Sequence, residues 1–407
     1  MQHQQEYVLR TVEERRVRLV RLWFTDVLGQ LKSVAISPVE LEAAFAEGVQ
    51  FDGSAIDGFS RMQESDVLAR PDPNSFQLMP TDDGETTARV FCDIANLDGS
   101  PFEGDPRQVL RRNLGVAADS GFEFMCAPEV EFFYFEPSGH GAAPVPLDEA
   151  SYFDLTANDS KGHIRRRTIQ RLEATGIPVE YSFHEDAPSQ HEIDLRYSDA
   201  LTMADNVMAL RMIVREVAMS GDVYATFMPK PMEGPGLGHA HPLSLWSAGA
   251  NAFHDPEARD GLSDVARSFI AGILAHARDH GGDEPARQLL QAAGRRLQAP
   301  VNISWAHNDR TALVRVPVPK REQEARATRI STGPWIRRAT PTWRSRCCWR
   351  PDWTASPGAT DSVRSRRRRC TTRRPSGTPG LLPANLSEAL GAMESSELVL
   401  ARSGSTS

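Results

Sequence analysis

The sequence predicts an α+β protein. Residues 17–36 alternate apolar and polar side chains as two strands do, around a turn at Leu28 and Gly29, and helix-start signals follow directly. From residue 105 to about residue 320, strand patterns and helix patterns alternate. The chain has 407 residues, of which 40% are hydrophobic, so it is long enough for two domains with ample core.

The N-terminal part is predicted to be a small α+β unit. Ser37 stands as an N-cap, Pro38 at the first helical position and Glu40 three residues after the cap, so a helix is expected to begin there. A strand is expected at 88–93. The Pro- and Gly-containing stretch 95–107 marks a domain boundary, and a second capped helix is expected to begin at its end, with Asp105 before Pro106.

Composition sets limits on the function classes. No window approaches the roughly 18 consecutive apolar residues of a membrane span, and the N-terminus lacks the features of a secretion signal, so we expect a cytoplasmic protein with no membrane partner. The five cysteines have no metal-ligand or disulfide spacing, so reduced thiols are expected. They are Cys92, Cys126, Cys347, Cys348 and Cys370.

Charge is unevenly distributed along the chain. Residues 321–380 hold 15 arginines and 4 acidic residues, whereas the remainder holds 31 basic and 50 acidic residues. The run 364–370 reads RSRRRRC, and four tryptophans precede it from residue 335 to residue 353. A nucleic-acid-binding segment is one interpretation of this tract, although arginine runs usually lie solvated on a surface.

Two acidic patterns lie where an ordinary core is expected. Glu129 and Glu131 are two residues apart in an apolar strand pattern, so both side chains project from the same face. Such a pair faces solvent, pairs with arginines or binds a divalent cation, because an unpaired buried carboxylate costs several kcal/mol. Glu180, Glu185 and Glu192 lie on two short strand patterns joined by a turn.

Together these carboxylates form a hard-oxygen set suited to Mg²⁺ or Mn²⁺. An acidic surface hairpin is the alternative for the second group. Asp52 and Asp57 lie among glycines in FDGSAIDGF, where a role in turn formation is the simpler interpretation.

The order and spacing of several motifs resemble class I glutamine synthetase. The similarity runs from about residue 5 to residue 320 and resumes at 382–398. The matching stretches are FDGSAIDGF, FEGDPR, APEVEFF, GIPVEYSFHE, QHEIDLRY, FMPKPM, LSLW, RSFIAGILAH and PVNISWAHNDRTALVRVP. This resemblance implies a β-grasp domain over 1–102 and a catalytic domain, an antiparallel sheet with helices, over 103–407.

The resemblance also implies an activity and its partners. It implies ATP-dependent ligation of L-glutamate and ammonium to L-glutamine through γ-glutamyl phosphate, with Mg²⁺ or Mn²⁺, in a homododecamer whose sites lie between subunits. A paralogous ligase that joins glutamate to a polyamine shares the same motifs and stays open. Phosphoryl transfer needs cations to neutralise developing oxygen charge, and ammonium attack needs an anionic base.

Individual site residues follow from the same resemblance. One metal ion would be held by Glu131, Glu185 and Glu192, and Glu129 would contribute to a second. Asp52 would face a neighbouring subunit and help to deprotonate ammonium. The nucleotide and phosphate side would be lined by Glu180, Ser244, Arg310 and Arg315, although surface arginines are the simpler interpretation of the last two.

The family pattern is lost in three tracts, near 235–242, 279–297 and 331–380. His239 and His241 stand one position early relative to the LSLW stretch that begins at Leu243. Gln298 stands where the family has a flap glutamate. The family's Arg-Ile-Glu-x-Arg is replaced by a stretch that begins at Arg329 and has Ser331 at the position of the metal carboxylate.

A displaced reading frame accounts for all three tracts. Permitted codons for 239–242, read one base later, give Met-His-Thr, and those for 279–293 give ITAVTNQLVNCYKR. Codons for 331–333 preceded by one lost G give Glu-Tyr-Arg. The literal tract 331–380 is therefore predicted to pack poorly, and this polypeptide is predicted to have little or no synthetase activity. On this hypothesis the arginine run and the tryptophans before it result from codons read in a displaced frame, so a nucleic-acid partner is not expected.

Overall fold

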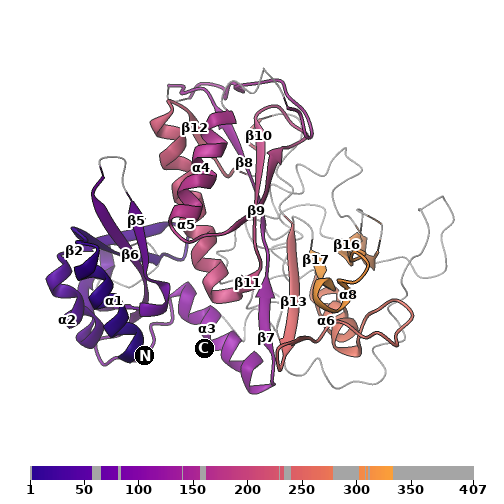
Figure 1. Cartoon of the computed structure of the whole chain (residues 1–407), viewed down its shortest axis with the longest axis horizontal. Coiled ribbons are helices and arrows are strands. Elements are labelled where there is room, and N and C mark those ends of the chain that lie inside the picture. Colours follow the sequence, from indigo (N-terminus) through magenta and orange to yellow (C-terminus); the bar gives the residue numbers. More distant parts are fainter. Residues whose placement is uncertain are drawn as a thin grey trace.

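The computed structural model describes residues 2–56, 66–80, 84–139, 141–155, 162–228, 230–232, 240–277, 302–307, 309 and 312–332. Within these residues there are three sheets, and the strands of the second and third interleave along the chain (Figure 1). None of the described helices combines the length and the apolar character that a membrane crossing requires.

The N-terminal sheet has the strand order β2-β1-β6-β4-β3, and β5 pairs with β6. The contact between β1 and β6 is parallel and the other pairings are antiparallel. Alternate residues of β1, among them Val20, Leu22 and Phe24, pack into the core beneath the sheet. The elements are α1 (Gln2–Glu14), β1 (Leu19–Thr25), β2 (Leu31–Ile36), α2 (Leu41–Glu47), β3 (Val49–Asp52), β4 (Asp66–Pro71), β5 (Gln77–Pro80) and β6 (Thr86–Ala95).

The two predicted helix starts have different outcomes. Asp105 caps α3 (Pro106–Asp119) by accepting from the backbone N–H of Arg107 at 2.8 Å, as predicted. Ser37 makes no side-chain capping bond. The residues after it, Pro38–Glu40, form a 3₁₀ turn, and α2 begins only at Leu41.

The middle sheet has the order β12-β8-β10-β9 and carries helices on one face. Val130, Phe132 and Tyr134 of β8 pack in one core with residues of the two helices, such as Leu172 and Ile213. Side chains alternate along a strand, so the residues that lie between Val130, Phe132 and Tyr134 project from the opposite face of β8. The elements are β8 (Glu129–Phe135), α4 (Gly162–Ala174), β9 (Val179–His184), β10 (Gln190–Leu195), α5 (Ala200–Ser220) and β12 (Tyr224–Thr226).

The third sheet has the order β11-β7-β13-β17-β16-β15, with β14 paired to β13. Its core includes Phe124, Phe253, Phe269 and Trp305. It adjoins the middle sheet because the backbone N–H of Glu129 donates to the carbonyl of Ala240 at 3.0 Å. The elements are β7 (Glu123–Cys126), β11 (Ser198–Asp199), β13 (His241–Ser247), β14 (Ala250–Asn251), α6 (Asp264–Ala275), β15 (Asn302–Ala306), β16 (Ala312–Arg315), α8 (Glu324–Ala327) and β17 (Ile330–Thr332).

A shared core and a buried ion network join the N-terminal sheet to the rest of the chain. Trp23, Met79 and Phe91 belong to the N-terminal unit, but their side chains pack in the hydrophobic core of the middle sheet. The Arg107 guanidinium contacts three carboxylates, Asp72 and Asp93 from the N-terminal unit and Asp205 from α5. The three contacts are 2.8, 2.5 and 2.9 Å long, and Arg111 also contacts Asp72 and Asp93.

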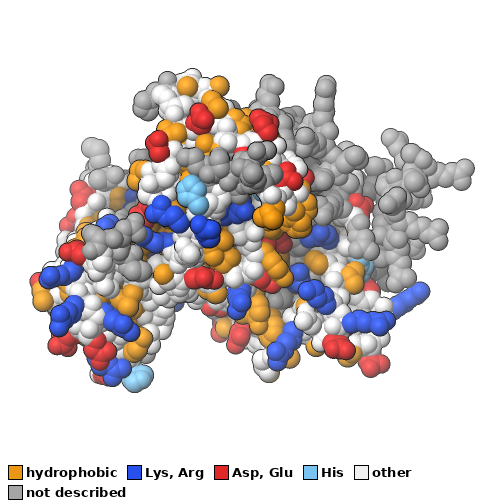
Figure 2. Space-filling view, turned by 45° about the horizontal axis from the view of Figure 1, so that its top comes forward, with side chains coloured by type: hydrophobic (Ala, Val, Ile, Leu, Met, Phe, Trp, Pro, Cys, Tyr) orange, Lys and Arg blue, Asp and Glu red, His pale blue; other side chains and the backbone are white. Residues whose placement is uncertain are grey.

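Acidic and basic side chains are interspersed on the face of the molecule shown in Figure 2. The arginine run 364–370 lies outside the described residues. The expectation that this run has no nucleic-acid partner therefore stays a prediction from sequence.

Candidate active site

A buried cluster of carboxylates lies on the face of the middle sheet opposite its helices. Strands β8 and β10 are antiparallel, with Glu131 directly opposite Glu192 and Glu129 directly opposite Asp194. Residues in such register have neighbouring side chains. Glu131 is 6% exposed and Glu192 is 5% exposed. The sheet therefore concentrates acidic groups where water does not shield them.

These carboxylates hinder one another's ionisation. Burial, followed by the charges of Glu131 and Asp194, raises the pKa of Glu192 to about 12. Burial also raises the pKa of Asp194 to about 7, with Glu129, Glu180 and Glu185 acting in the same direction and its hydrogen bond with Glu192 opposing them. Like charges that share a low-dielectric site cannot all ionise without a compensating cation.

The donor set fits a hard divalent cation. Every member offers carboxylate oxygens, which Mg²⁺ and Mn²⁺ prefer. The Oδ1 atom of Asp194 is buried and has no hydrogen-bond partner. The Gln190 amide donates to Glu131 Oε2 at 2.6 Å and fixes that carboxylate from one side. A bound cation would reduce the mutual repulsion that helps to raise the pKa values of Glu192 and Asp194.

Glu185 reaches this cluster from a turn. It is the residue directly after β9, so it lies one position beyond the strand on which the sequence pattern placed it. Its backbone N–H donates to the carbonyl of Gln190 at 2.7 Å, which closes the turn between β9 and β10. Glu180 lies within β9 and contributes to the acidic field around Asp194.

The third sheet brings further predicted residues together. Ser244 lies in β13 and accepts a hydrogen bond from the indole N–H of Trp246 at 3.1 Å. Arg315 of β16 stands opposite Ser331 of β17, which in turn pairs with Pro242 of β13. Ser331 is only 3% exposed. The position to which the sequence resemblance assigns a metal carboxylate is thus a buried position between two strands of the sheet.

Asp52 lies in another sheet. It ends β3, an edge strand of the N-terminal sheet, and its side chain is exposed. Its carboxylate accepts from the backbone N–H of Ser54 at 2.8 Å, and hydrogen bonding by Ser54 lowers the pKa of Asp52. Within this one chain, its described hydrogen bond is local.

Two family models match this chain. "Glutamine synthetase, beta-Grasp domain" matches residues 16–97, and "Glutamine synthetase, catalytic domain" matches residues 103–335. A glutamine synthetase of Mycolicibacterium smegmatis is 48% identical over 414 residues, covering 98% of this chain and 92% of the relative. The chain belongs to the glutamine synthetase family.

Solved structures share this fold. A glutamine synthetase of Plasmodium falciparum, 20% identical, shares the fold with a TM-score of 0.84 and covers 97% of this chain and 90% of its own. A structure titled "Apo GmaS without ligand", 25% identical, has a TM-score of 0.80 and covers 98% of this chain and 92% of its own. The predicted α+β fold, a β-grasp domain followed by a catalytic domain, is confirmed.

The family is one of ATP-dependent ligases that use divalent metal ions, which accords with the donor set described above. The roles of individual residues stay predictions. His239, Gln298 and Arg310 lie outside the described residues, as do the tract 279–297 and the chain from residue 333.

The described parts of the displaced tracts are ordered in the sheet. His241 opens β13 opposite Thr332, next to the backbone bond between Ala240 and Glu129. Arg329 donates to the carbonyl of Ala327 at 3.2 Å. Ser331 and Thr332, predicted to belong to a poorly packed tract, are instead buried in β17. Backbone pairing with β13 and β16 holds these two residues whatever their side chains.

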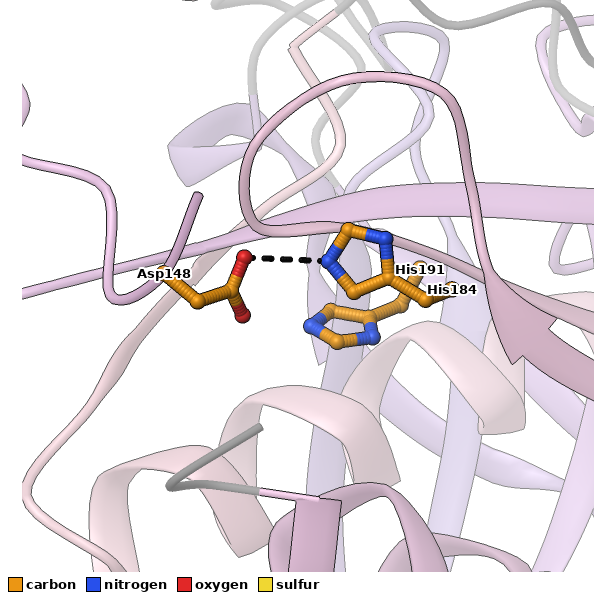
Figure 3. Close-up of side chains that lie close together, drawn as sticks. All are labelled: Asp148, His184 and His191. Carbon is orange, nitrogen blue, oxygen red and sulfur yellow. Dashed lines mark hydrogen bonds and ion pairs between the residues drawn. The ribbon is translucent and has the colours of Figure 1, made fainter. Parts of the chain in front are cut away.

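The sequence reasoning missed three features of the site. Asp194 follows Glu192 by two residues, the same spacing that identified Glu129 and Glu131, and this signal could have found it. The Tyr197 ring stacks on Trp246 with centroids 6.2 Å apart, a contact between distant residues that no local pattern reveals. Behind the carboxylates lies a buried group of Asp148, His184 and His191 (Figure 3).

Proposed function

We propose that this site is built to ligate L-glutamate and ammonium to L-glutamine with ATP, through γ-glutamyl phosphate. The observation that supports it most is the facing of Glu131 with Glu192 and of Glu129 with Asp194 on one buried sheet face. Such an arrangement suits the binding of divalent cations beside transferring phosphoryl groups. Membership of the glutamine synthetase family supports the substrates.

Each residue has a part in this proposal. Glu131, Glu185 and Glu192 would hold one Mg²⁺ or Mn²⁺ ion, and Glu129 would contribute to a second. When bound, these ions neutralise negative charge on the phosphoryl oxygens. Arg315 supplies a fixed positive charge on the phosphate side, together with Arg310.

Two other parts of the chain would complete the site. Ser244 and Glu180 would line the nucleotide side. Asp52, exposed at the edge of the N-terminal sheet, would accept a proton from ammonium bound in the site of a neighbouring subunit. This requires an oligomer, and we infer a cytoplasmic homododecamer composed of chains with domains over 1–102 and 103–407.

The first prediction concerns metal binding. Glu192→Gln is expected to weaken Mn²⁺ binding at least about tenfold, because one anionic ligand is lost. The same change is expected to stabilise the metal-free protein, because folding no longer has to protonate a carboxyl that is ionised in the unfolded chain but whose pKa is raised by burial and by Glu131. Electron paramagnetic resonance titration of Mn²⁺ and thermal unfolding in a chelator measure the two effects.

Glu123→Gln is the matched control for this measurement. Glu123 lies on β7 and is exposed, so this variant makes the same side-chain change outside the cluster. Both Mn²⁺ affinity and stability should stay close to those of the parent protein. Equal Mn²⁺ affinity in all three proteins would mean that the carboxylate cluster is not the metal site.

The second prediction concerns the amine. In a chain whose displaced tracts have been restored, ammonium is expected to support ATP-dependent product formation and putrescine is not, because Asp52 is suited to deprotonate ammonium. The fold is also that of a protein titled GmaS, so the amine has to be tested directly. Product identification by mass spectrometry with each amine decides it. Turnover with putrescine in preference to ammonium would favour the polyamine ligase.

A further inference from the structure

Asp148 lies behind the carboxylate cluster and binds the turn between β9 and β10. Its Oδ1 atom accepts from the backbone N–H groups of Ser189, at 2.8 Å, and Ala150, at 3.2 Å. In return, the Ser189 hydroxyl oxygen accepts from the backbone N–H groups of Leu147, at 2.6 Å, and Asp148, at 3.0 Å. The segment 147–150 and the turn therefore hold each other by reciprocal bonds.

The turn needs this support because its conformation is unfavourable by itself. Ser189 has a φ of 56°, in the left-handed region that non-glycine residues rarely adopt. Its side chain is fully buried. Such a conformation costs of order 1–3 kcal/mol and persists only where surrounding contacts determine it.

His184 connects Asp148 to Glu185. Its Nε2 atom lies 3.0 Å from Asp148 Oδ1, and its Nδ1 atom lies 2.7 Å from the carbonyl oxygen of Glu185. Both partners are acceptors, so both ring nitrogens act as donors. The ring therefore binds the backbone of Glu185, one of the proposed metal ligands.

The three side chains Asp148, His184 and His191 also lie close enough to suggest a metal site of their own (Figure 3). The hydrogen bonds argue against it. A histidine ligand needs a free nitrogen lone pair, and both nitrogens of His184 donate. His191 Nδ1 accepts from Arg165 Nη1 at 2.6 Å, so its other nitrogen carries the proton, and the guanidinium repels a cation.

The turn sets the geometry of the carboxylates. Glu185 begins it, Glu192 follows it in β10, and Gln190 at its end accepts from the backbone N–H of Ala187 and donates to Glu131. We propose that Asp148 is a positioning residue of the metal site, which holds Glu185 and Glu192 in place through His184 and Ser189. This inference rests on the proposed function of the carboxylate cluster.

Asp148→Ala and Asp148→Asn, made in the full chain, test it. The alanine variant loses the acceptor for Ser189, so Mn²⁺ affinity is expected to fall about 10- to 100-fold. Amide hydrogen exchange over residues 185–190 is expected to accelerate in the same variant. The asparagine variant keeps an acceptor oxygen, so its Mn²⁺ affinity and its amide exchange should stay close to those of the parent protein. Glu149→Ala is the control, because Glu149 is the exposed neighbouring carboxylate.

The possible outcomes distinguish the proposed metal site from the proposed positioning role of Asp148. A parent protein that binds no Mn²⁺ removes the proposed metal site, and hydrogen exchange then decides the positioning role alone. If the parent binds Mn²⁺ and Asp148→Ala changes neither affinity nor exchange, the positioning role is wrong. Co²⁺ bound by the parent and lost in His191→Ala, with Mn²⁺ binding unchanged, would instead show that this group is itself a metal site.

Discussion

Replacing Arg107 by leucine is expected to lower the free energy of unfolding by about 3–5 kcal/mol. The side chain of Arg107 is 5% exposed and contacts Asp72, Asp93 and Asp205, of which Asp72 and Asp205 are 8% and 9% exposed. Removing the cation leaves these carboxylates in a low-dielectric region without a full counter-charge. Chemical denaturation of the parent and the variant measures the difference.

Arg111→Leu is the matched comparison. Arg111 lies one helical turn further along α3 and contacts two of the same carboxylates, but its side chain is 35% exposed. Water can replace much of the favourable charge interaction that Arg111 makes with these carboxylates. A loss of at most about 1 kcal/mol in the free energy of unfolding is therefore expected. Equal losses in the two variants would show that burial does not determine the strength of this network.

The pH dependence of the Arg107 effect has a definite sign. Burial raises the pKa of Asp72, but Arg107 and Arg111 outweigh burial, so the pKa lies below its ordinary value. A carboxyl with a lowered folded-state pKa contributes stability above its unfolded pKa of about 3.9 and loses it as pH falls through the folded value. The difference in free energy of unfolding between the parent and Arg107→Leu should therefore become smaller in acid. Asp205 adds to this narrowing: burial raises its pKa and Arg107 opposes that rise, so removing Arg107 raises the pKa of Asp205 further and makes it take up a proton more readily in acid.

Local patterns in the sequence predicted the parts of the site that depend on strand periodicity. Glu129 and Glu131 were identifiable because a spacing of two in an apolar strand fixes their common face. The register that sets Glu131 opposite Glu192 is a contact across 61 residues of chain, and no local signal specifies it. The burial of Arg107 likewise depends on how the N-terminal sheet meets α5.

Family resemblance predicted roles that periodicity could not. Ser244 and Arg315 are unremarkable in isolation, and the fold places both in the third sheet. The resemblance did not predict Asp148, because its importance comes from bonds to a turn about 40 residues later rather than from a motif. Tertiary hydrogen bonds of this kind become visible only in the folded chain.

If the reading frame is displaced as we infer from the sequence, restoring it is expected to change activity most. This chain has Gln298 and Ser331 at positions to which the sequence resemblance assigns carboxylates. Loss of even one preorganised charge-stabilising group costs about a hundredfold or more in rate. The restored C-terminal tract would also supply buried leucines, each contributing about 1.5–3 kcal/mol. Glutamine formation by the literal and restored chains, purified in parallel, measures the difference.

Ser331→Glu in the unrestored chain distinguishes the effect of the missing carboxylate from the effect of the lost packing in the C-terminal tract. The position is buried opposite Arg315 on a sheet that is already formed, so a carboxylate can be added there without the rest of the displaced tract. Stronger Mn²⁺ binding with little recovery of activity is expected, because the restored tract is still needed for packing and for the flap. Sequencing the gene across codons 232 to 382 provides the independent check. A single intact frame that encodes these tracts as they stand would contradict the frame hypothesis. Full activity of the unrestored chain would separately show that the missing carboxylates have no chemical consequence.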